Sequence, residues 1–489
     1  MIDVSNLVDS ENGLVSRRLF ADAEVYDLEL QRIFSRCWLF LGHESQIARP
    51  GDFVQTRMGN EPVILTRNAL GEIRAFINTC RHRGNRVCRV DQGRTSRFMC
   101  AYHGWTYDLD GKLVSVPGFE DRYYSELDRD QWGLIPVTQL ATYKGLIFGS
   151  FDADAVPLEE YLGEARWALD YVLDQRAGGT EVVGGVFKWI IKSNWKLGAD
   201  NIMGDNYHGG VTHKSATMVG HQTGQRFVRE QVPNGVQPEG AFGHEGVPSF
   251  SFDDPAGQSA SRGSSDPIAP TAAGPARERD PRTRLGFTAP LDWGHGLMCD
   301  LVPEGQARVR SGDAIGDYYR STLPEMRARL GDLRARVWKV NFTVFPNASF
   351  TTGSNMLHVW HPLGPNATEV WLYVIVDKEA PEDVKQQIRR LSQRHFSPAG
   401  MFEQDDMDNW EQSTEAAGGM IARDYPLHYA MGLGHEPWAG EGEVSRRMDT
   451  IMDESNQRAF YRGWAEFMSG KSWDTLRQDR QDAPANFGP

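Results

Sequence analysis

Two cysteine–histidine pairs constrain this chain more than any other feature of its sequence. Cys80 and His82 form the first pair, and Cys100 and His103 form the second, with residues 83–99 between them. Two thiolates and two imidazoles at the ends of short strands can close on one metal group from opposite sides. Cysteine ligands on one iron and histidine ligands on the other are the arrangement of a Rieske [2Fe–2S] cluster.

A Cys2His2 zinc site is the alternative for these four residues. Zinc sites usually use CxxC pairs, whereas this sequence has one CxH pair and one CxxH pair. Gly84 and Gly104 follow the two pairs, where they would let backbone amides approach the sulfurs of a cluster. The pattern therefore favours iron–sulfur over zinc. The other cysteines are expected to be small buried hydrophobic residues: Cys37, Cys88 and Cys299.

Length, composition and charge exclude several classes of protein. At about 150 residues per domain, 489 residues make roughly three domains, or two if one is large. A hydrophobic fraction of 40% excludes wholesale disorder, and a net charge of −14 argues against a general nucleic-acid binder. Five cysteines do not make a disulfide scaffold, and they favour a reducing compartment. Without a long apolar run or a secretory signal, the expected location is the cytoplasm, with no membrane span.

The sequence pattern divides the chain into a β-rich part and a larger mixed part. Helical spacing of apolar residues predicts a helix over 22–38, and short β-type runs with an Asp110-Gly111 hairpin turn predict an all-β domain over 40–155. Residues 254–284, rich in Ser, Ala, Pro and Gly, predict a long loop. Beyond the β-rich part, helices are expected at 158–176, 381–394, 397–414 and 442–470, and strands at 182–191, 337–346, 356–361 and 370–376.

A second group of candidate ligands lies in the mixed helical stretch 194–215. Asp205 and His208 are spaced i,i+3, which would place them on one face of a helix. His208 and His213 would lie about 140° apart on a straight helix. The Gly-Gly pair between them is therefore expected to distort the helix and bring His213 round. With one carboxylate, two imidazoles make a 2-His-1-carboxylate face that leaves positions open on ferrous iron.

The histidine spacing alone is weak evidence, since surface or core histidines often show it; the cluster pattern in the same chain strengthens it. The carboxylate must come from elsewhere, and the run 396–410 carries Glu403, Asp405 and Asp406. Ser397 is a candidate N-cap for a helix there, followed by a proline suited to the first turn. Complementation of the helix dipole, or a solvated acidic face, is the alternative for these acids.

Taken together, these segments resemble the large (α) subunits of Rieske non-haem iron aromatic-ring-hydroxylating dioxygenases of the naphthalene, biphenyl and toluene type. The resemblance covers nearly the whole chain, including NTCRHRGNRVC…CAYHGWTYDLDGKL, NWK…DNYHGGVTH, VWHPLGPNATEVW, GMFEQDDMDNW and NQRAFYRGWAEFM. It implies an α+β fold, with a small all-β Rieske domain (39–155) inserted in a large catalytic domain (156–489). An antiparallel sheet flanked by helices, of the START-like or helix-grip kind, is expected there, with residues 1–38 packed on it.

The resemblance also implies roles for individual residues. Cys80 and Cys100 would bind one cluster iron and His82 and His103 the other. The catalytic iron would be held by His208, His213 and Asp406. Asp205 would connect a metal histidine to a cluster histidine of a neighbouring α subunit, with Asn201 as a polar residue near the iron. The expected substrate pocket comprises Ile202, Met203, Gly209, Phe396 and Phe402.

The implied reaction, in aromatic hydrocarbon catabolism, adds both atoms of O2 to neighbouring ring carbons and gives a cis-dihydrodiol. No Gly-rich dinucleotide fingerprint follows a strand, so NADH-derived electrons must arrive from a separate ferredoxin, a reductase or both. The resemblance implies a ring of three α subunits, because the two centres of one subunit are too far apart, often completed by a small β subunit. The region 233–285 is longer than the family pattern leads one to expect.

Three other functions remain open from the sequence. A Rieske hydroxylase of an aryl carboxylate, of the salicylate or phthalate type, would need an arginine in its pocket, for which Arg308 and Arg310 are candidates. A purely electron-carrying Rieske protein would not need the second ligand group or the residues beyond the β-rich part. A zinc-stabilised binding protein would lack the visible and EPR spectra of a cluster.

Overall fold

The structure is a computed structural model that describes residues 3–218, 228–229, 285–303, 306–307, 314–436, 442–445 and 447–482. Within these ranges, none of the helices combines the length and the apolar character that crossing a membrane requires. The predicted loop 254–284 and the long region 233–285 that contains it lie outside the described residues, except for Leu285, the first residue of a strand.

The N-terminal segment packs on the large domain. A predicted helix over 22–38 is confirmed in part, because α1 (Ala23–Glu29) is followed by a wide helical turn over Leu30–Phe34. Asp22 caps α1 by accepting a hydrogen bond from the backbone N–H of Glu24. The short strands β1 (Val8–Asp9) and β2 (Leu14–Val15) form a small sheet with β23 (Leu427–His428), so the segment is joined to the distant C-terminal part.

The β-rich part is built from three small antiparallel sheets, as the short β-type runs predict. One sheet has the order β6-β5-β4-β7, the second β10-β9-β8 and the third β11-β12-β3. A separate buried apolar cluster fills it and includes Cys80 and Cys100. Its strands are β3 (Leu39–His43), β4 (Asp52–Met58), β5 (Glu61–Arg67), β6 (Ile73–Ile77), β7 (Gln92–Arg94), β8 (Phe98–Met99), β9 (Thr106–Tyr107), β10 (Leu113–Ser115), β11 (Gln139–Tyr143) and β12 (Leu146–Ser150).

The large part is organised around one eight-stranded antiparallel sheet. Its strand order is β13-β22-β21-β20-β19-β17-β16, and β14 also pairs with β22. The long apolar run in β22 is buried almost throughout, as expected for a central strand. The strands are β13 (Thr180–Val182), β14 (Phe187–Ile191), β16 (Leu285–Pro290), β17 (Gly296–Leu301), β19 (Val337–Val344), β20 (Ala348–Thr351), β21 (Met356–Gly364) and β22 (Ala367–Asp377). A separate pair joins β15 (Val228–Arg229) to β18 (Gln306–Ala307).

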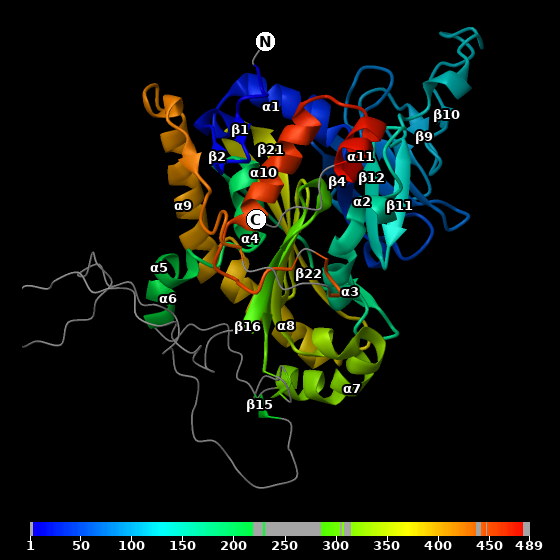
Figure 1. The fold of residues 1–489 in the computed structure, drawn as a ribbon. Coiled ribbons are helices and arrows are strands. Elements are labelled where there is room, and N and C mark those ends of the chain that lie inside the picture. The colour runs from blue at the N-terminus through cyan, green and yellow to red at the C-terminus, as the bar shows by residue number, and fades with distance from the viewer. Residues whose placement is uncertain are drawn as a thin grey trace, which may run out of the picture.

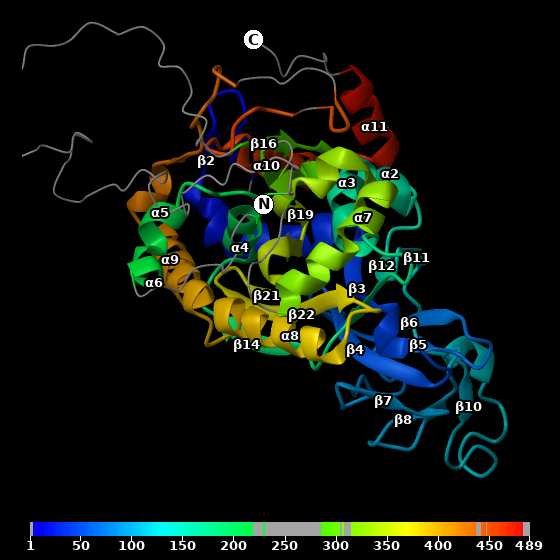
Figure 2. The same cartoon turned by 90° about the horizontal axis from the view of Figure 1, so that it is seen from below.

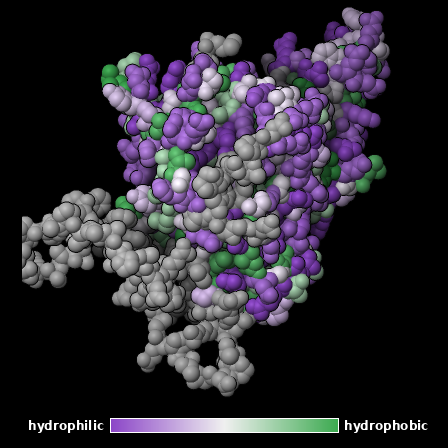
Figure 3. Space-filling view, viewed as in Figure 1, coloured by the Kyte–Doolittle hydropathy of each residue, from purple (hydrophilic) through white to green (hydrophobic). Residues whose placement is uncertain are grey.

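Helices cover both faces of this sheet. In Figure 2, α4 and α9 lie on one side of the sheet and α3 and α7 on the other. The helices are α2 (Leu158–Leu162), α3 (Arg166–Leu173), α4 (Trp195–Ile202), α5 (Gly209–Thr212), α6 (Lys214–Met218), α7 (Ala314–Ala335), α8 (Glu382–Phe396), α9 (Met401–Ala417), α10 (Ser455–Met468) and α11 (Trp473–Asp482). The face in Figure 3 is largely hydrophilic where its residues are described. The expected α+β architecture, with a small all-β part beside a helix-flanked antiparallel sheet, is confirmed (Figure 1).

Several predicted boundaries were wrong for local reasons. The helix predicted over 158–176 is broken at Gly163, whose φ of +47° is unfavourable for other residues. Ser397 does not cap the helix that carries Asp406: that helix begins at Met401 after Gly400, and the Ser397 hydroxyl accepts from the N–H of Ala399 instead. The helix predicted over 442–470 begins only at Ser455, and the strand predicted over 182–191 is two strands.

Candidate metal centres

The two cysteine–histidine pairs meet at one end of the β-rich part. Cys80 follows β6 and Cys100 follows β8, and both thiols are almost completely buried. Each pair is followed by a glycine with positive φ whose N–H bonds back to the carbonyl of the cysteine: Gly84 to Cys80 at 2.9 Å and Gly104 to Cys100 at 3.0 Å. Two similar turns therefore face each other, as the spacing of the motif predicts.

The histidines complete the convergence. The rings of His82 and His103 lie 4.5 Å apart between centroids, and Trp105 stacks on His82 at 5.0 Å. The Nδ1 atom of His82 is buried and has no hydrogen-bond partner among the described residues. A buried nitrogen without a partner costs free energy unless it binds something, so this atom fits a metal ligand. Two buried thiols and two adjacent imidazoles suit a Rieske cluster.

Hydrogen-bond donors surround the two sulfur atoms. The Tyr107 hydroxyl lies 3.3 Å from Cys80 Sγ, and the Asn85 amide donates to Cys100 Sγ at 3.6 Å. Burial raises the pKa of Cys80. For Cys100, burial also acts to raise the pKa, but the Tyr102 N–H and the Asn85 amide hold it below its usual value. Donors of this kind stabilise negative charge on ligand sulfurs.

The second candidate centre depends on the anchoring of α4. Asn194 caps the helix by accepting from the Lys196 N–H at 3.1 Å. The Lys196 ammonium lies 2.6 Å from the Glu29 carboxylate, and both groups are fully buried. The indoles of Trp195 and Trp464 also donate to Glu29, at 2.9 and 2.7 Å. This buried ion pair anchors the first turn of α4, and the candidate ligands follow the other end of the helix, after Ile202.

Asp205 does not lie on a helix face, so that prediction was wrong. Helix α4 ends at Ile202, and Gly204, with φ of +140°, turns the chain away. Asp205 sits in the following turn, where its Oδ1 accepts from the N–H groups of Tyr207 and His208 at 3.1 and 3.2 Å. The carboxylate therefore fixes the backbone of His208 as well as facing its ring.

Three side chains converge at one point, as the sequence predicts. The Nε2 atoms of His208 and His213 are 3.3 Å apart, and each lies 3.4 Å from Oδ1 of Asp406. His208 and His213 flank the one-turn helix α5, which contains both glycines, so the helix ends at His213 and not at the Gly-Gly pair as predicted. Donors bonded at about 2.1 Å to one ion would be about 3.0–3.4 Å apart at right or tetrahedral angles. The geometry thus fits a single divalent metal ion.

A second carboxylate faces the outer nitrogen of each histidine. Asp205 Oδ2 lies 3.4 Å from Nδ1 of His208, and Asp405 Oδ2 lies 3.3 Å from Nδ1 of His213. Such partners orient the ring and make it a better ligand. Sequence reasoning considered Asp405 only beside Asp406, without this role. The sequence feature that could have predicted this role is the adjacent pair Asp405 and Asp406, since one helix turn can direct two carboxylates to different atoms of one site.

The histidines and carboxylates at this centre shift one another's pKa values. Burial lowers the pKa of His208, but Asp205 and Asp406 outweigh it and raise the pKa to about 10. Burial lowers the pKa of His213. The neighbouring carboxylates raise it only in part, so the pKa stays below its usual value. For Asp205, burial acts to raise the pKa, but His208 holds it below its usual value. A metal ion that binds Nε2 of His208 must displace a proton there.

Aromatic residues form one wall beside the ligands. Phe402 packs edge-on against His213, with centroids 4.9 Å apart, and Phe396 lies 5.6 Å from Phe402. Behind them is a fully buried pair that the sequence did not reveal: His358 Nε2 lies 3.0 Å from Glu403 Oε2. Glu403 stands one helix turn before Asp406 on α9. The pair joins the start of that helix to β21.

The other predicted site residues lie close in sequence but differ in placement. Asn201 lies near the end of α4. Its backbone carbonyl, and not its side-chain amide, contacts the segment that carries the ligands, because it accepts from the Asp205 N–H at 3.0 Å. Ile202 and Met203 are buried, and Met203 accepts from the Asn456 amide. Gly209 opens α5 directly after His208. The arginines considered for an aryl carboxylate lie outside the described residues: Arg308 and Arg310.

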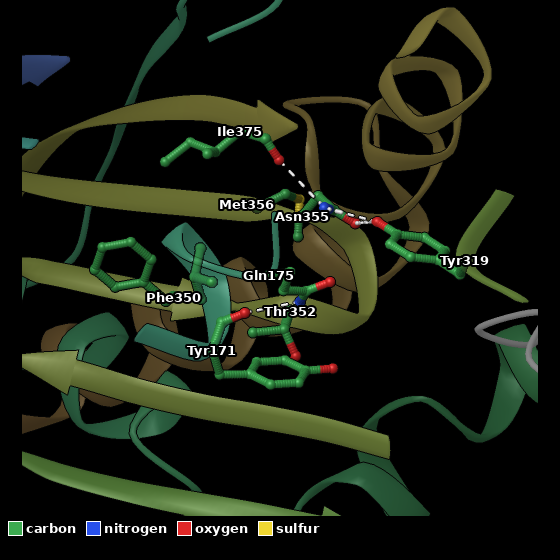
Figure 4. Close-up of a pocket in the computed structure, with 9 residues that line it drawn as sticks. Tyr171, Gln175, Tyr319, Phe350, Thr352, Asn355, Met356 and Ile375 are labelled. Carbon is green, nitrogen blue, oxygen red and sulfur yellow. Dashed lines mark hydrogen bonds between the residues drawn. The ribbon is translucent and has the colours of Figure 1, made fainter. Parts of the chain in front are cut away.

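A pocket lies on the face of the large sheet opposite the candidate metal centre, and none of the predicted substrate-pocket residues lines it. Figure 4 shows Asn355 donating to the Ile375 carbonyl and bonded to Tyr319. Gln175 there donates to the Tyr171 carbonyl at 2.7 Å. The full lining is Tyr171, Val172, Gln175, Tyr319, Phe350, Thr352, Asn355, Met356 and Ile375. This pocket is therefore separate from the candidate metal centre.

Known proteins match both parts of the chain. Residues 37–142 match the Rieske [2Fe-2S] domain, and residues 158–470 match the ring hydroxylating alpha subunit catalytic domain. The biphenyl 2,3-dioxygenase subunit alpha of Rhodococcus jostii (strain RHA1) is 37% identical over 480 residues, covering 98% of this chain and 94% of the relative. The benzene 1,2-dioxygenase subunit alpha of Pseudomonas putida is 34% identical over 480 residues, covering 98% and 96%.

Solved structures agree with the sequence matches. A naphthalene 1,2-dioxygenase with indole bound in its active site superposes with a TM-score of 0.81 at 32% identity, covering 98% of both chains. Family membership brings with it a Rieske [2Fe–2S] cluster and a mononuclear iron. The buried thiols of Cys80 and Cys100 with the adjacent rings of His82 and His103 fit the cluster, and the His-His-Asp group fits the mononuclear iron. The chain therefore belongs to the α subunits of the Rieske aromatic-ring-hydroxylating dioxygenases.

Proposed function

We propose that this chain is the large subunit of a terminal oxygenase that adds both atoms of O2 to neighbouring carbons of an aromatic ring. The product is a cis-dihydrodiol, and two electrons come from NADH through separate electron-transfer proteins. The convergence of His208, His213 and Asp406 in one chain with a Rieske domain carries this proposal. The names of the relatives, which are biphenyl, benzene and naphthalene dioxygenases, support an aromatic hydrocarbon as substrate.

In this proposal the ligand roles follow the geometry. Cys80 and Cys100 bind one cluster iron, and His82 and His103 bind the other. His208, His213 and Asp406 hold the mononuclear iron, which when bound supplies the site where O2 is reduced beside the substrate. Asp205 and Asp405 orient the two imidazoles, because each carboxylate lies within 3.4 Å of a ring Nδ1. Phe396 and Phe402 are proposed to line the substrate pocket, where Phe402 packs against His213 and Phe396 against Phe402.

Asp205 has a further role in the proposal. Its side chain is 34% exposed although it faces His208, so it can reach a group outside its own subunit. We place it opposite a cluster histidine of a neighbouring α subunit, where it forms the bridge between centres. This arrangement requires a ring of α subunits, for which we propose a trimer with a small β subunit. Asn201 and the residues Ile202, Met203 and Gly209 are proposed to lie at the substrate side of the iron.

Product analysis with labelled oxygen tests the reaction. The purified oxygenase, supplied with NADH, a reductase and a ferredoxin, is given a panel of mono-, bi- and polycyclic arenes and aryl acids under 18O2. We expect a cis-dihydrodiol carrying both labelled atoms, with one NADH consumed per product. Incorporation of a single labelled atom into an aryl acid would instead support the hydroxylase of an aryl carboxylate. A colourless, EPR-silent protein would contradict both.

A further inference from the structure

The segment around the first cluster pair has a charge opposite to that of the protein. The chain carries a net charge of −14, yet the segment 81–97, which begins with Arg81 and ends with Arg97, contains six arginines and one aspartate. In Figure 2 the strands of this region, β7 and β8, project from the molecule away from the large sheet. A concentrated positive field at an exposed tip attracts negatively charged partners and raises their rate of association.

Most of this charge is not neutralised within the chain. Arg94 pairs with Asp52 at 2.7 Å, and Asp91 pairs with Lys188 rather than with an arginine. Arg89 and Arg97 are exposed and have no carboxylate within 4.0 Å among the described residues. Their charges therefore remain available to a partner.

The arginines border an apolar hollow in the surface. A groove of about 330 Å3 is lined by Arg89, Arg94 and Arg97 together with apolar side chains. Val90 and Met99 are 58% and 63% exposed at this groove. We call this surface the arginine groove; its apolar lining is Phe53, Val87, Val90, Phe98 and Met99. An exposed apolar centre with a charged rim is typical of a protein–protein contact.

The arginine groove is connected to a cluster ligand by hydrogen bonds. Arg89 donates to the side-chain oxygen of Asn85 at 3.2 Å, and the Asn85 amide donates to Cys100 Sγ at 3.6 Å. Met99, on the groove, is also the residue next to Cys100 in the chain. Only the Asn85 side chain would then separate a partner bound to Arg89 from the sulfur ligand of Cys100.

We propose that the arginine groove is the docking surface for an acidic electron-transfer protein, which delivers electrons to the cluster from its cysteine side. The inference rests on the proposed function, in which this chain has no reductant-binding motif of its own. One electron passes at each encounter: the reduced iron–sulfur centre of the donor is oxidised by one electron, and the Rieske cluster is reduced by one. No bond is made or broken.

The position of the groove favours a donor over a second copy of this chain. In the proposed function the histidine side of the cluster faces the neighbouring subunit, near the exposed Tyr102, whereas the groove adjoins a cysteine ligand. A small groove with unpaired charges also suits a transient encounter, for which small interfaces and electrostatic steering are usual. Entry and exit of electrons would then use different sides of one domain.

Charge reversal tests the inference on the assembled holoenzyme. The probe is a purified acidic [2Fe–2S] ferredoxin, used oxidised for binding by calorimetry and reduced for stopped-flow reduction of the cluster. We expect Arg89→Glu with Arg97→Glu to weaken binding and slow reduction at least about tenfold at low ionic strength. Salt should produce the same effect in the wild type. Reduction by dithionite, which needs no docking, should be unchanged.

A matched variant controls for net charge. Arg390→Glu with Arg423→Glu changes two exposed arginines on the large domain by the same amount, and it should bind and be reduced like the wild type. Equal rates for the groove variant and the wild type would overturn the inference, as would salt-insensitive binding. So would a change in oligomeric state on gel filtration, which would make the groove an interface between copies. Failure of chemically reduced enzyme to hydroxylate any arene would contradict the proposed function while leaving the binding result valid.

Discussion

The Nδ1 atom of His213 lies 3.3 Å from Oδ2 of Asp405, the residue directly before the candidate ligand Asp406. We predict that Asp405→Ala lowers the affinity for the mononuclear iron by about 10–100-fold, because the imidazole loses its orienting partner. Iron content per cluster after challenge with a chelator measures this. Asp408→Ala, an exposed acid on the same helix, is the control and should retain its iron.

Removal of the carboxylate ligand should separate the two centres. In Asp406→Ala the two histidines remain 3.3 Å apart but lose their shared acceptor. We expect the iron-to-sulfide ratio to fall from about 3:2 to about 2:2, with the Rieske absorption and EPR signals retained. His208→Ala should behave in the same way. Loss of the cluster spectrum in either variant would speak against two independent centres.

Asp205 should matter for turnover even when the iron site is filled. Its Oδ2 is 3.4 Å from His208 Nδ1, so its loss should weaken iron binding as the loss of Asp405 does, but His208, His213 and Asp406 still provide the ligand atoms. We predict that Asp205→Ala, loaded with excess Fe(II), keeps both metal centres and loses turnover with NADH. Metal analysis and steady-state assays on the same preparation measure both quantities. Full activity of this variant would refute the bridging role.

The buried pair of His358 and Glu403 should hold α9 in place. Removal of one partner leaves an unpaired buried group, which costs about 3–5 kcal/mol, whereas replacement of both by apolar residues costs less. His358→Leu and Glu403→Leu should each lower the unfolding temperature and the iron content, and the double variant should recover part of both. His361→Leu is the matched control, since His361 is equally buried on β21 without a hydrogen-bond partner among the described residues. Additive losses in the double variant would show that the two side chains are not coupled.

The hydroxyl of Tyr107 should tune the cluster. It lies 3.3 Å from Cys80 Sγ, where a hydrogen bond favours the more negative, reduced state. We expect Tyr107→Phe to lower the reduction potential by roughly 60 mV, which corresponds to about 1.4 kcal/mol for one electron. A spectroscopic redox titration measures it. Tyr143→Phe removes a hydroxyl bonded to Asp170 instead and should leave the potential unchanged.

The sequence by itself identified the cysteine and histidine candidates for both centres, whereas the choice of Asp406 rested on the family resemblance. Cys80 with His82, Cys100 with His103, and His208 with His213 are each separated by a few residues, and glycines follow or divide them. The cluster spacing favours a metal centre because a short chain segment can place its donors on one group in few ways, and it strengthens the weaker His208–His213 signal. The α+β class and the central strands also followed from local pattern, since apolar periodicity reflects which side of an element is buried.

Only the tertiary structure decided which distant residues complete each site. His213 and Asp405 are 192 residues apart, and His358 and Glu403 are 45 residues apart. In the structure Asp205 lies in a turn rather than on the predicted helix face, and α9 begins at Met401 rather than at the predicted Ser397. These outcomes depend on the burial of Glu29 with Lys196, on the packing of α4 against the sheet and on the packing of α9 against α4 and α8. Local spacing in the sequence determines which donor atoms can bind one ion. Long-range packing determines which carboxylates contact the ligand histidines.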